Sequence, residues 1–259
     1  MTVPFWGKSA KVKGRVPFKL CSRGVRIPLL LARSCGILAL AGSGAALADD
    51  FHGYVTAATD YVFRGVSQSD EQPTLQAGLD YAHSSGFFVG VFAAGIDYPE
   101  TSFRPDPGTY EVDAYLGYSR PAGRDLSWNV ALFDYEHPES EADDTNYQEL
   151  GASLYYRDVA RFSATYSDDA HSGNSSAWTA ELELRRSLGT NFQLSGTLGR
   201  YSFARDDWKD YLYWDLGVSA TKGPWTFDLR YFDTSDEAET LAGPDLTRDR
   251  VVASVSIGF

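Results

Sequence analysis

Hydrophobic and polar residues alternate along most of the chain after residue 49, as expected for β-strands with one apolar face. The alternation is clearest over the last ten residues, 250–259, where every second position is apolar. That apolar face consists of Val251, Ala253, Val255, Ile257 and Phe259. An apolar strand face that ends on an aromatic ring is typical of the closing strand of an outer-membrane barrel. We therefore expect these residues to meet lipid and to carry the assembly signal.

Twelve segments of this kind are predicted, and their connections alternate between five short turns and six long loops. The segments are 51–64, 75–81, 87–97, 110–118, 126–135, 147–157, 161–167, 177–188, 192–203, 211–221, 225–234 and 250–259. Soluble all-β folds do not sort their loops so regularly. The pattern predicts an all-β fold, a transmembrane antiparallel up-and-down β-barrel of about 12 strands.

The predicted outer face gathers aromatic residues at the end of the short turns. These are Phe51, Tyr81, Phe87, Tyr118, Trp128, Tyr156, Phe162, Phe192, Trp225 and Phe259. Aromatic residues scattered at random would not cluster at one end. We interpret them as one of the aromatic girdles with which such barrels contact the membrane interface.

The predicted inner face holds charges on nearly every strand. The candidate lumen-lining residues are Asp60, Arg64, Asp80, Glu111, Asp113, Glu149, Glu181, Glu183, Arg185, Asp215, Asp228, Arg230 and Arg250, and Arg157 and Arg161 fall on the same predicted face. In a soluble sandwich core each buried unpaired ion would cost several kcal/mol. A hydrated lumen removes that objection. Within this set Arg64 and Asp60 share a face, either as a structural ion pair that fixes the first loop or as solute contacts.

The first 48 residues predict a secretory signal peptide. They hold eight Lys or Arg and no acidic residue, and an apolar run over 36–47 ends in Ala46-Leu47-Ala48. An anchoring helix is the alternative, but it needs roughly 20 apolar residues. We therefore expect a cleaved leader over 1–48 and an outer-membrane barrel over 49–259.

The expected leader contains both cysteines, so the mature chain has no disulfide or thiolate chemistry. It also contains eight of the 23 basic residues, which leaves 15 against 35 acidic residues, a net charge of −20. That sign disfavours nucleic-acid binding.

One stretch carries a family resemblance. Residues 59–69, Thr-Asp-Tyr-Val-Phe-Arg-Gly-Val-Ser-Gln-Ser, are followed by 76–81, Gln-Ala-Gly-Leu-Asp-Tyr, and by 85–90, Ser-Gly-Phe-Phe-Val-Gly. This signature resembles the TorF-type porin family of proteobacteria, and segments around 111–118, 147–149 and 211–234 are similar to later parts of its pattern. The resemblance implies an outer-membrane barrel, and a transport role through the family's label.

Three functions fit such a barrel, because fold does not determine function. The first is a porin-like channel for passive diffusion of small hydrophilic solutes or ions, weakly cation-preferring because acids outnumber arginines on the inner face. The second is a non-conducting structural or interaction barrel whose inward charges pair and plug the lumen. The third is an outer-membrane lipid hydrolase.

The hydrolase has little support in the sequence. His83 and Ser85 have the spacing of a twelve-stranded phospholipase class, but they lie at a predicted turn, where we expect no nearby carboxylate or amide partner. We therefore expect no enzyme activity, cofactor or metal. The expected location is the outer membrane of a Gram-negative bacterium, and the expected partners are outer-membrane lipids, lipopolysaccharide, the barrel-assembly machinery and small solutes or ions.

Overall fold

The computed structural model describes residues 49–97, 108–140 and 145–259. The expected leader over 1–48 lies outside the described residues, as do parts of two of the predicted long loops.

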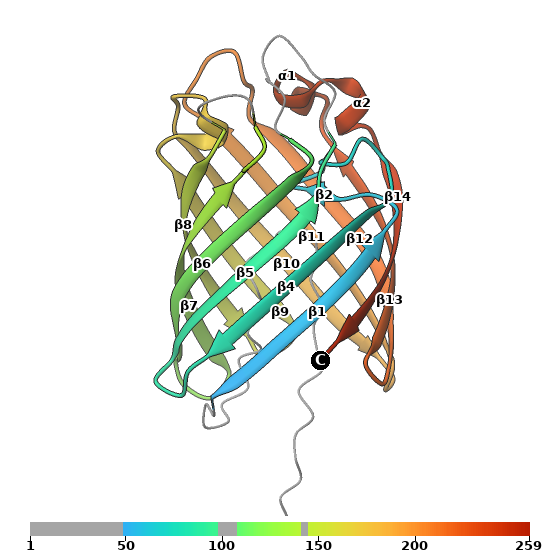
Figure 1. Ribbon diagram of the computed structural model, residues 1–259. Coiled ribbons are helices and arrows are strands. Elements are labelled where there is room, and N and C mark those ends of the chain that lie inside the picture. Colours follow the sequence, from blue (N-terminus) through green and yellow to red (C-terminus); the bar gives the residue numbers. More distant parts are fainter. Residues whose placement is uncertain (1–48, 98–107, 141–144) are drawn as a thin grey trace, which may run out of the picture.

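Twelve antiparallel strands form a closed barrel, as the alternation predicts (Figure 1). Consecutive strands pair with each other, and β1 pairs with β14 to close the barrel. The strands are β1 (Asp50–Ala58), β4 (Thr74–Ala82), β5 (Phe87–Gly95), β6 (Tyr110–Pro121), β7 (Leu126–Glu136), β8 (Tyr147–Tyr156), β9 (Ala160–Ser167), β10 (Ala177–Leu188), β11 (Phe192–Phe203), β12 (Tyr211–Lys222), β13 (Trp225–Thr234) and β14 (Arg250–Gly258).

Short turns lie at one end of the barrel, together with the C-terminus, and long loops lie at the other end (Figure 1). The long loop between β13 and β14 contains η2 (Asp236–Ala238), α1 (Glu239–Ala242) and α2 (Pro244–Thr247), and the loop between β9 and β10 contains η1 (Ala170–Ser172). Leu246 of α2 and Ala238 of η2 are buried in one cluster with Tyr201 and Tyr211 of the barrel wall. The last long loop is therefore packed onto the barrel.

The outer face is apolar because every second residue of each strand points outward. On β5, Phe87, Val89 and Val91 are exposed, while Phe88 and Phe92 are buried on the inner side. The sequence leaves the orientation of this strand open, since both of its faces are apolar. The inward phenylalanines belong to an aromatic cluster that lines one side of the lumen, formed mainly from β1 and β5–β8.

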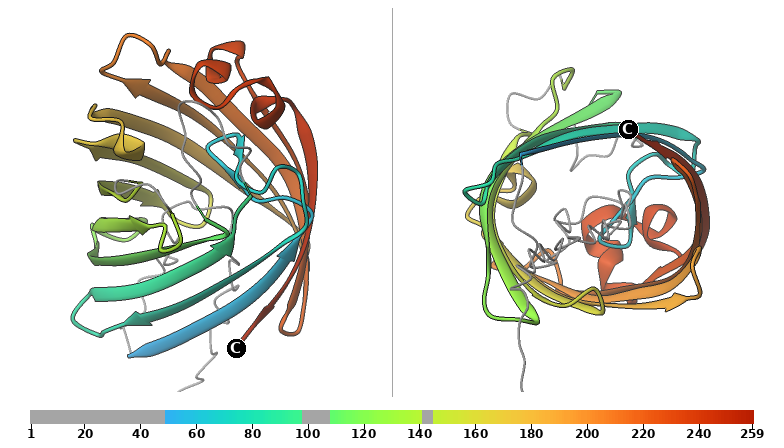
Figure 2. Two further views of the ribbon diagram at one scale, coloured as in Figure 1. Left: turned by 45° about the horizontal axis from the view of Figure 1, so that its top comes forward. Right: turned by 90° about the horizontal axis from the view of Figure 1, so that it is seen from below.

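The first predicted strand, 51–64, is too long. β1 ends at Ala58, and the chain then turns into the barrel interior as a small hairpin of β2 (Val62–Phe63) and β3 (Val66–Ser67), visible inside the barrel in Figure 2. We call residues 59–72 the inner hairpin. Tyr61 and Phe63, expected on the lipid face, are 1% and 7% exposed and pack in the aromatic cluster of the lumen.

The turn of the inner hairpin explains the inward fold. Arg64 and Gly65 connect the two short strands, with φ angles of 50° and 83°. Positive φ at both central residues is the type I′ geometry that suits two-residue hairpins. Gly65 also lies close to the wall, because a Cβ there would lie 2.3 Å from Thr234 Cγ2.

Candidate channel lumen

Arg64 is held at the tip of the inner hairpin by a forked contact with the barrel wall. Its Nη1 and Nη2 donate to Oε1 and Oε2 of Glu149 on β8, at 2.7 and 2.6 Å. Nη2 also donates to Thr165 Oγ1 on β9, at 3.1 Å. The guanidinium lies over the rings of Phe63 and Tyr201, 4.5 and 4.6 Å from their centroids. Two parallel charge-assisted bonds plus stacking fix the geometry of this pair.

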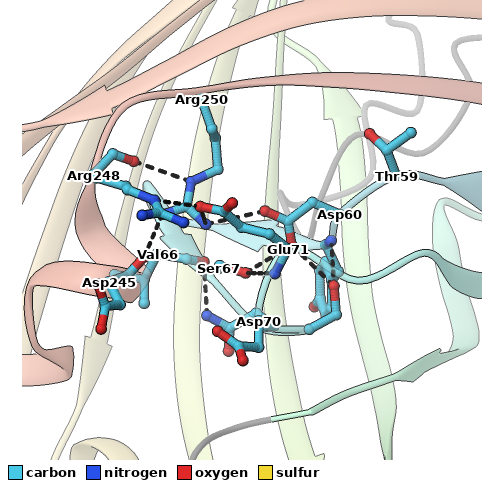
Figure 3. A network of polar contacts seen from close by, with 12 residues as sticks. Thr59, Asp60, Val66, Ser67, Asp70, Glu71, Asp245, Arg248 and Arg250 are labelled. Atoms are coloured by element: carbon cyan, nitrogen blue, oxygen red, sulfur yellow. Dashed lines mark hydrogen bonds and ion pairs between the residues drawn. The ribbon is translucent and has the colours of Figure 1, made fainter.

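The base of the inner hairpin is attached to β14 and to the last long loop (Figure 3). Asp60 accepts hydrogen bonds from the hydroxyls of Ser67 and Ser69, at 2.7 and 2.9 Å, which close the base. Arg250 Nη1 lies 3.1 Å from Asp60 Oδ2 and 3.6 Å from Glu71 Oε1. Asp60 and Glu71 of the hairpin thus share one arginine.

Arg248 adds a second contact to the same hairpin, because its Nε donates to Glu71 Oε1 at 2.7 Å (Figure 3). This hydrogen bond lowers the pKa of Glu71, against the opposing effect of partial burial, and the charges of Arg250 and Arg248 lower it further. The two arginines therefore favour the ionised form of Glu71.

Most of the other inward carboxylates of the β9–β13 wall are paired with arginines of the same wall. Glu183 lies 3.3 Å from Arg161 Nε and 2.6 Å from Arg185 Nη2. Glu181 lies 3.6 Å from Arg161 and accepts a hydrogen bond of 2.8 Å from the Tyr213 hydroxyl.

Arg230 forms a second group on the same wall. It binds Asp215 of the neighbouring strand and Asp228 of its own strand, the latter at 3.1 Å. Its Nη2 also donates a hydrogen bond to Ser195 Oγ, at 3.2 Å. This part of the wall therefore has mostly paired charges.

The β4–β6 wall has a different character. On β4, β5 and β6, which the structure describes in full, no inward position holds an arginine. Asp80 accepts a hydrogen bond from the Tyr115 hydroxyl, and Asp113 is 2% exposed. Glu111 accepts a hydrogen bond of 3.0 Å from the Tyr61 hydroxyl. His137, a lumen residue that the sequence did not single out, has its Nε2 3.4 Å from the other oxygen of Glu111.

All of the predicted inward residues except Arg157 lie inside the barrel. The structure places all thirteen candidate lumen residues inside the barrel, with Asp60 and Arg64 on the inner hairpin and the rest on the strands. Asp60 and Arg64 do not pair with each other, because the turn directs them to Arg250 and Glu149. The expectation for Arg157 is wrong, since its exposed side chain lies in a short turn, 3.1 Å from Asp125.

The five predicted assembly residues alternate outward along β14, with Val251 and Phe259 among the most exposed apolar residues. Phe259 exchanges backbone hydrogen bonds of 2.9 Å with Gly53 of β1 in both directions. Its ring covers Gly53, because a Cβ there would lie 2.5 Å from the ring. The C-terminal residue is therefore part of the seam that closes the barrel.

Rings of the predicted girdle lie against each other at the short-turn end. The centroids of Phe51 and Tyr81 are 4.7 Å apart, and Tyr118 lies 4.9 Å from Phe87 and 6.1 Å from Trp128. These contacts link β1 to β4 and β5 to β7 on the outer face.

The expectation that His83 and Ser85 have no carboxylate nearby is wrong. Ser85 Oγ lies 2.6 Å from His83 Nδ1, and His83 Nε2 lies 3.9 Å from Asp49 Oδ1. The same Nδ1 accepts the Ser85 backbone N–H at 3.2 Å, and the same Asp49 oxygen accepts the Ser84 N–H at 3.0 Å. These backbone contacts are those of a side-chain-stabilised turn.

Comparison with known proteins gives a family and a fold. The family described as "Bacterial protein of unknown function (Gcw_chp)" matches residues 43–259, and the chain belongs to this family. A search of curated proteins found no match. The KdgM porin superposes with a TM-score of 0.51 at 7% identity, over 80% of this chain and 99% of that one. The NanC porin superposes with 0.51 at 9% identity, over 80% and 98%.

These two porins share the fold of this chain.

In the described ranges, no helix is long and apolar enough to cross a bilayer. Nor do the described residues include three or more His, Cys, Asp or Glu side chains placed to hold a metal ion.

Proposed function

We propose that this member of the Gcw_chp family is an outer-membrane channel for passive diffusion of small hydrophilic solutes or ions. One observation carries the proposal: the barrel is closed, apolar on its outside and charged on the inner face of most strands. An apolar outside suits lipid, and charged inward side chains suit a hydrated lumen. The fold shared with two porins supports the same function.

The width of the barrel predicts a narrow path. Barrels of about 8 strands are filled by side chains, whereas those of about 16 to 18 hold an open channel. Twelve strands lie between these limits, and the inner hairpin narrows the lumen further. We therefore expect ions and small solutes to pass and large oligomers to be excluded.

A weak cation preference is part of the proposal. It is supported by the β4–β6 wall, where Asp80, Glu111 and Asp113 face inward on strands without inward arginines. Charges along a pore wall tune its selectivity. Changing Glu111→Gln together with Asp113→Asn should weaken the cation preference in a salt gradient while the barrel still folds. An unchanged reversal potential would show that these two residues do not influence the ions in the channel.

The second candidate function is a non-conducting structural or interaction barrel. Two observations favour it: the inner hairpin lies in the lumen, and the carboxylates of the β9–β13 wall are largely paired with arginines. In that case replacing an arginine-paired carboxylate by an amide, as in Glu183→Gln, should lower stability, because breaking a buried pair costs roughly 3–5 kcal/mol.

The remaining proposals concern activity and partners. We assign no catalytic role to Ser85, because its contacts with His83 are those of an exposed turn. The proposed partners are outer-membrane lipids, lipopolysaccharide at the long-loop end, and the barrel-assembly machinery at the β14 strand. The TorF-type resemblance of residues 59–90 supports the transport role.

Solute uptake into proteoliposomes tests the proposal. Folded protein in liposomes should cause swelling in solutions of small hydrophilic solutes, and the swelling rate should fall steeply with solute size. Liposomes that carry the same amount of heat-denatured protein are the control. Equal, slow swelling in both preparations would contradict the channel and favour the structural barrel.

A further inference from the structure

We propose that Arg64 and Glu149 form the selectivity-determining pair of the channel, at a constriction that the inner hairpin creates. The inference rests on the proposed channel function and deepens it. It assigns the control of ion passage to one residue of the hairpin and one residue of the wall.

The inner hairpin is fixed to several sides of the barrel at once. Its backbone lies inside the barrel (Figure 2), and its contacts reach β6, β8, β12 and β14, so it is held from several sides of the lumen. The contacts are Tyr61 with Glu111, Arg64 with Glu149, the Arg64 carbonyl oxygen with the Tyr211 hydroxyl, and Asp60 with Arg250.

The Arg64–Glu149 pair joins the inner hairpin to the barrel wall, whereas the ion pairs of β10 and β13 lie within the wall. Glu183 and Arg185 belong to one strand, and so do Asp228 and Arg230, so these charges cancel along the wall itself. Arg64 instead comes from the hairpin and reaches Glu149 on the wall, 85 residues away in sequence. A solute that passes on this side must pass the pair or separate it.

The pair is neutral as a whole, but each partner alone would leave one charge. Arg64 is always protonated, and Glu149 receives both of its forked hydrogen bonds. The two side chains are 6% and 2% exposed, so an ion meets their charges only when it passes directly beside the pair. With the screening of water, a single unit charge at about 5 Å from an ion changes the local ion concentration about fourfold. Removing Arg64 therefore favours cations, removing Glu149 favours anions, and removing both charges restores the starting balance.

The test uses full-length mature protein and three variants: R64Q, E149Q and the double variant R64Q/E149Q. Reversal potentials are measured in planar bilayers under a potassium chloride gradient. The expected result is a cation-ward change in the permeability ratio of about fourfold for R64Q and an anion-ward change of about the same size for E149Q. The double variant should match the wild type in selectivity and exceed it in conductance, because the cross-lumen link is gone.

R200Q is the matched control. Arg200 pairs with Asp210 at 2.8 Å on the exposed outer rim, away from the lumen, so this variant should keep the wild-type reversal potential. Heat-modifiable migration on gels reports whether each variant is folded. If R64Q does not fold, E149Q and the neutral double variant still carry the test, because only E149Q should then shift the ratio.

The outcomes separate this inference from the proposed function. A conducting wild type with unchanged ratios in E149Q and R64Q would overturn the selectivity role and leave the channel intact. Shifts in the same direction for both single variants would also overturn it. Folded protein that is silent as wild type and in every variant would contradict the channel itself, and the inference with it.

Discussion

Arginine side chains neutralise many carboxylates of the barrel interior, and the choice of partner depends on the register of the strands. Glu183 meets Arg161 because the two residues are paired across β9 and β10. Asp215 meets Arg230 diagonally across β12 and β13, because the register pairs Arg230 with Gly217, two residues further along β12. The alternation predicts that these residues face inward, but it does not predict which of them meet.

A charged substitution at Val255 tests whether this residue faces lipid on the closing strand. Val255 faces outward on β14, opposite Ala57 of β1. Val255→Asp should lower folded yield sharply, since a carboxylate on the lipid face costs up to about 2 kcal/mol. Ser254→Asp, on the inner face one residue away, is the control and should be far milder. Gel migration of unheated samples measures both, and equal yields would contradict the assigned face.

Gly53 tests the seam formed with the C-terminal residue. The Phe259 ring lies where a side chain at position 53 would begin, so Gly53→Leu should displace the ring and cost about 1–3 kcal/mol. Ala57→Leu, on the same exposed face of β1, should be tolerated. In a Phe259→Ala background the Gly53→Leu penalty should shrink, because the clash is gone. Urea unfolding of the refolded barrels measures these differences. An unchanged penalty in that background would show that the ring is not the cause.

Among the elements, the first predicted strand is wrong at its end, where the structure has the inner hairpin. Residues 59–64 continue the alternation of β1, so they were expected to extend that strand. Their inward turn depends on positive φ at Arg64 and on long-range contacts with Glu149 and Arg250. The dipeptide Arg64-Gly65 is the local sequence signal for this turn, because glycine suits its second position. The signal is weak, because turns of this type usually have Asn, Asp or Gly at the first position.

The contact between Glu71 and Arg248 predicts acid sensitivity of the hairpin. Because this contact lowers the pKa of Glu71 in the folded state, its contribution to stability is present above about pH 4.3, the ordinary value for Glu. The contribution is lost as the pH falls through the lower folded-state pKa. The difference in unfolding midpoint between wild type and Glu71→Gln should therefore be largest near neutral pH and vanish in acid. A difference that stays constant from pH 6 to pH 3 would contradict the contact.

For the whole molecule, the strand number and the sorting of short and long connections follow from the sequence. Both arise from local rules, namely strand alternation and the composition of turns, and the closed barrel confirms them. The contents of the lumen do not follow from such rules. The aromatic cluster around Phe92 and Tyr115 and the hairpin depend on which side chains the closed barrel brings together.

Export is a prediction for the whole chain. The mature protein should begin at or near Asp49 and fractionate with the outer membrane, because residues 1–48 have the composition of a cleaved leader. Mass spectrometry of the purified protein and density separation of membranes measure both. Retention of residues 1–48, or recovery with the inner membrane, would contradict the expected processing and location.

Single-channel recording of refolded mature protein tests the central claim most directly. A lumen that conducts predicts discrete current steps in planar bilayers, with conductance below that of wider porins and a weak cation preference in a salt gradient. Folded protein that inserts into the bilayer without current steps would contradict the channel and support a barrel closed by its own paired charges and inner hairpin.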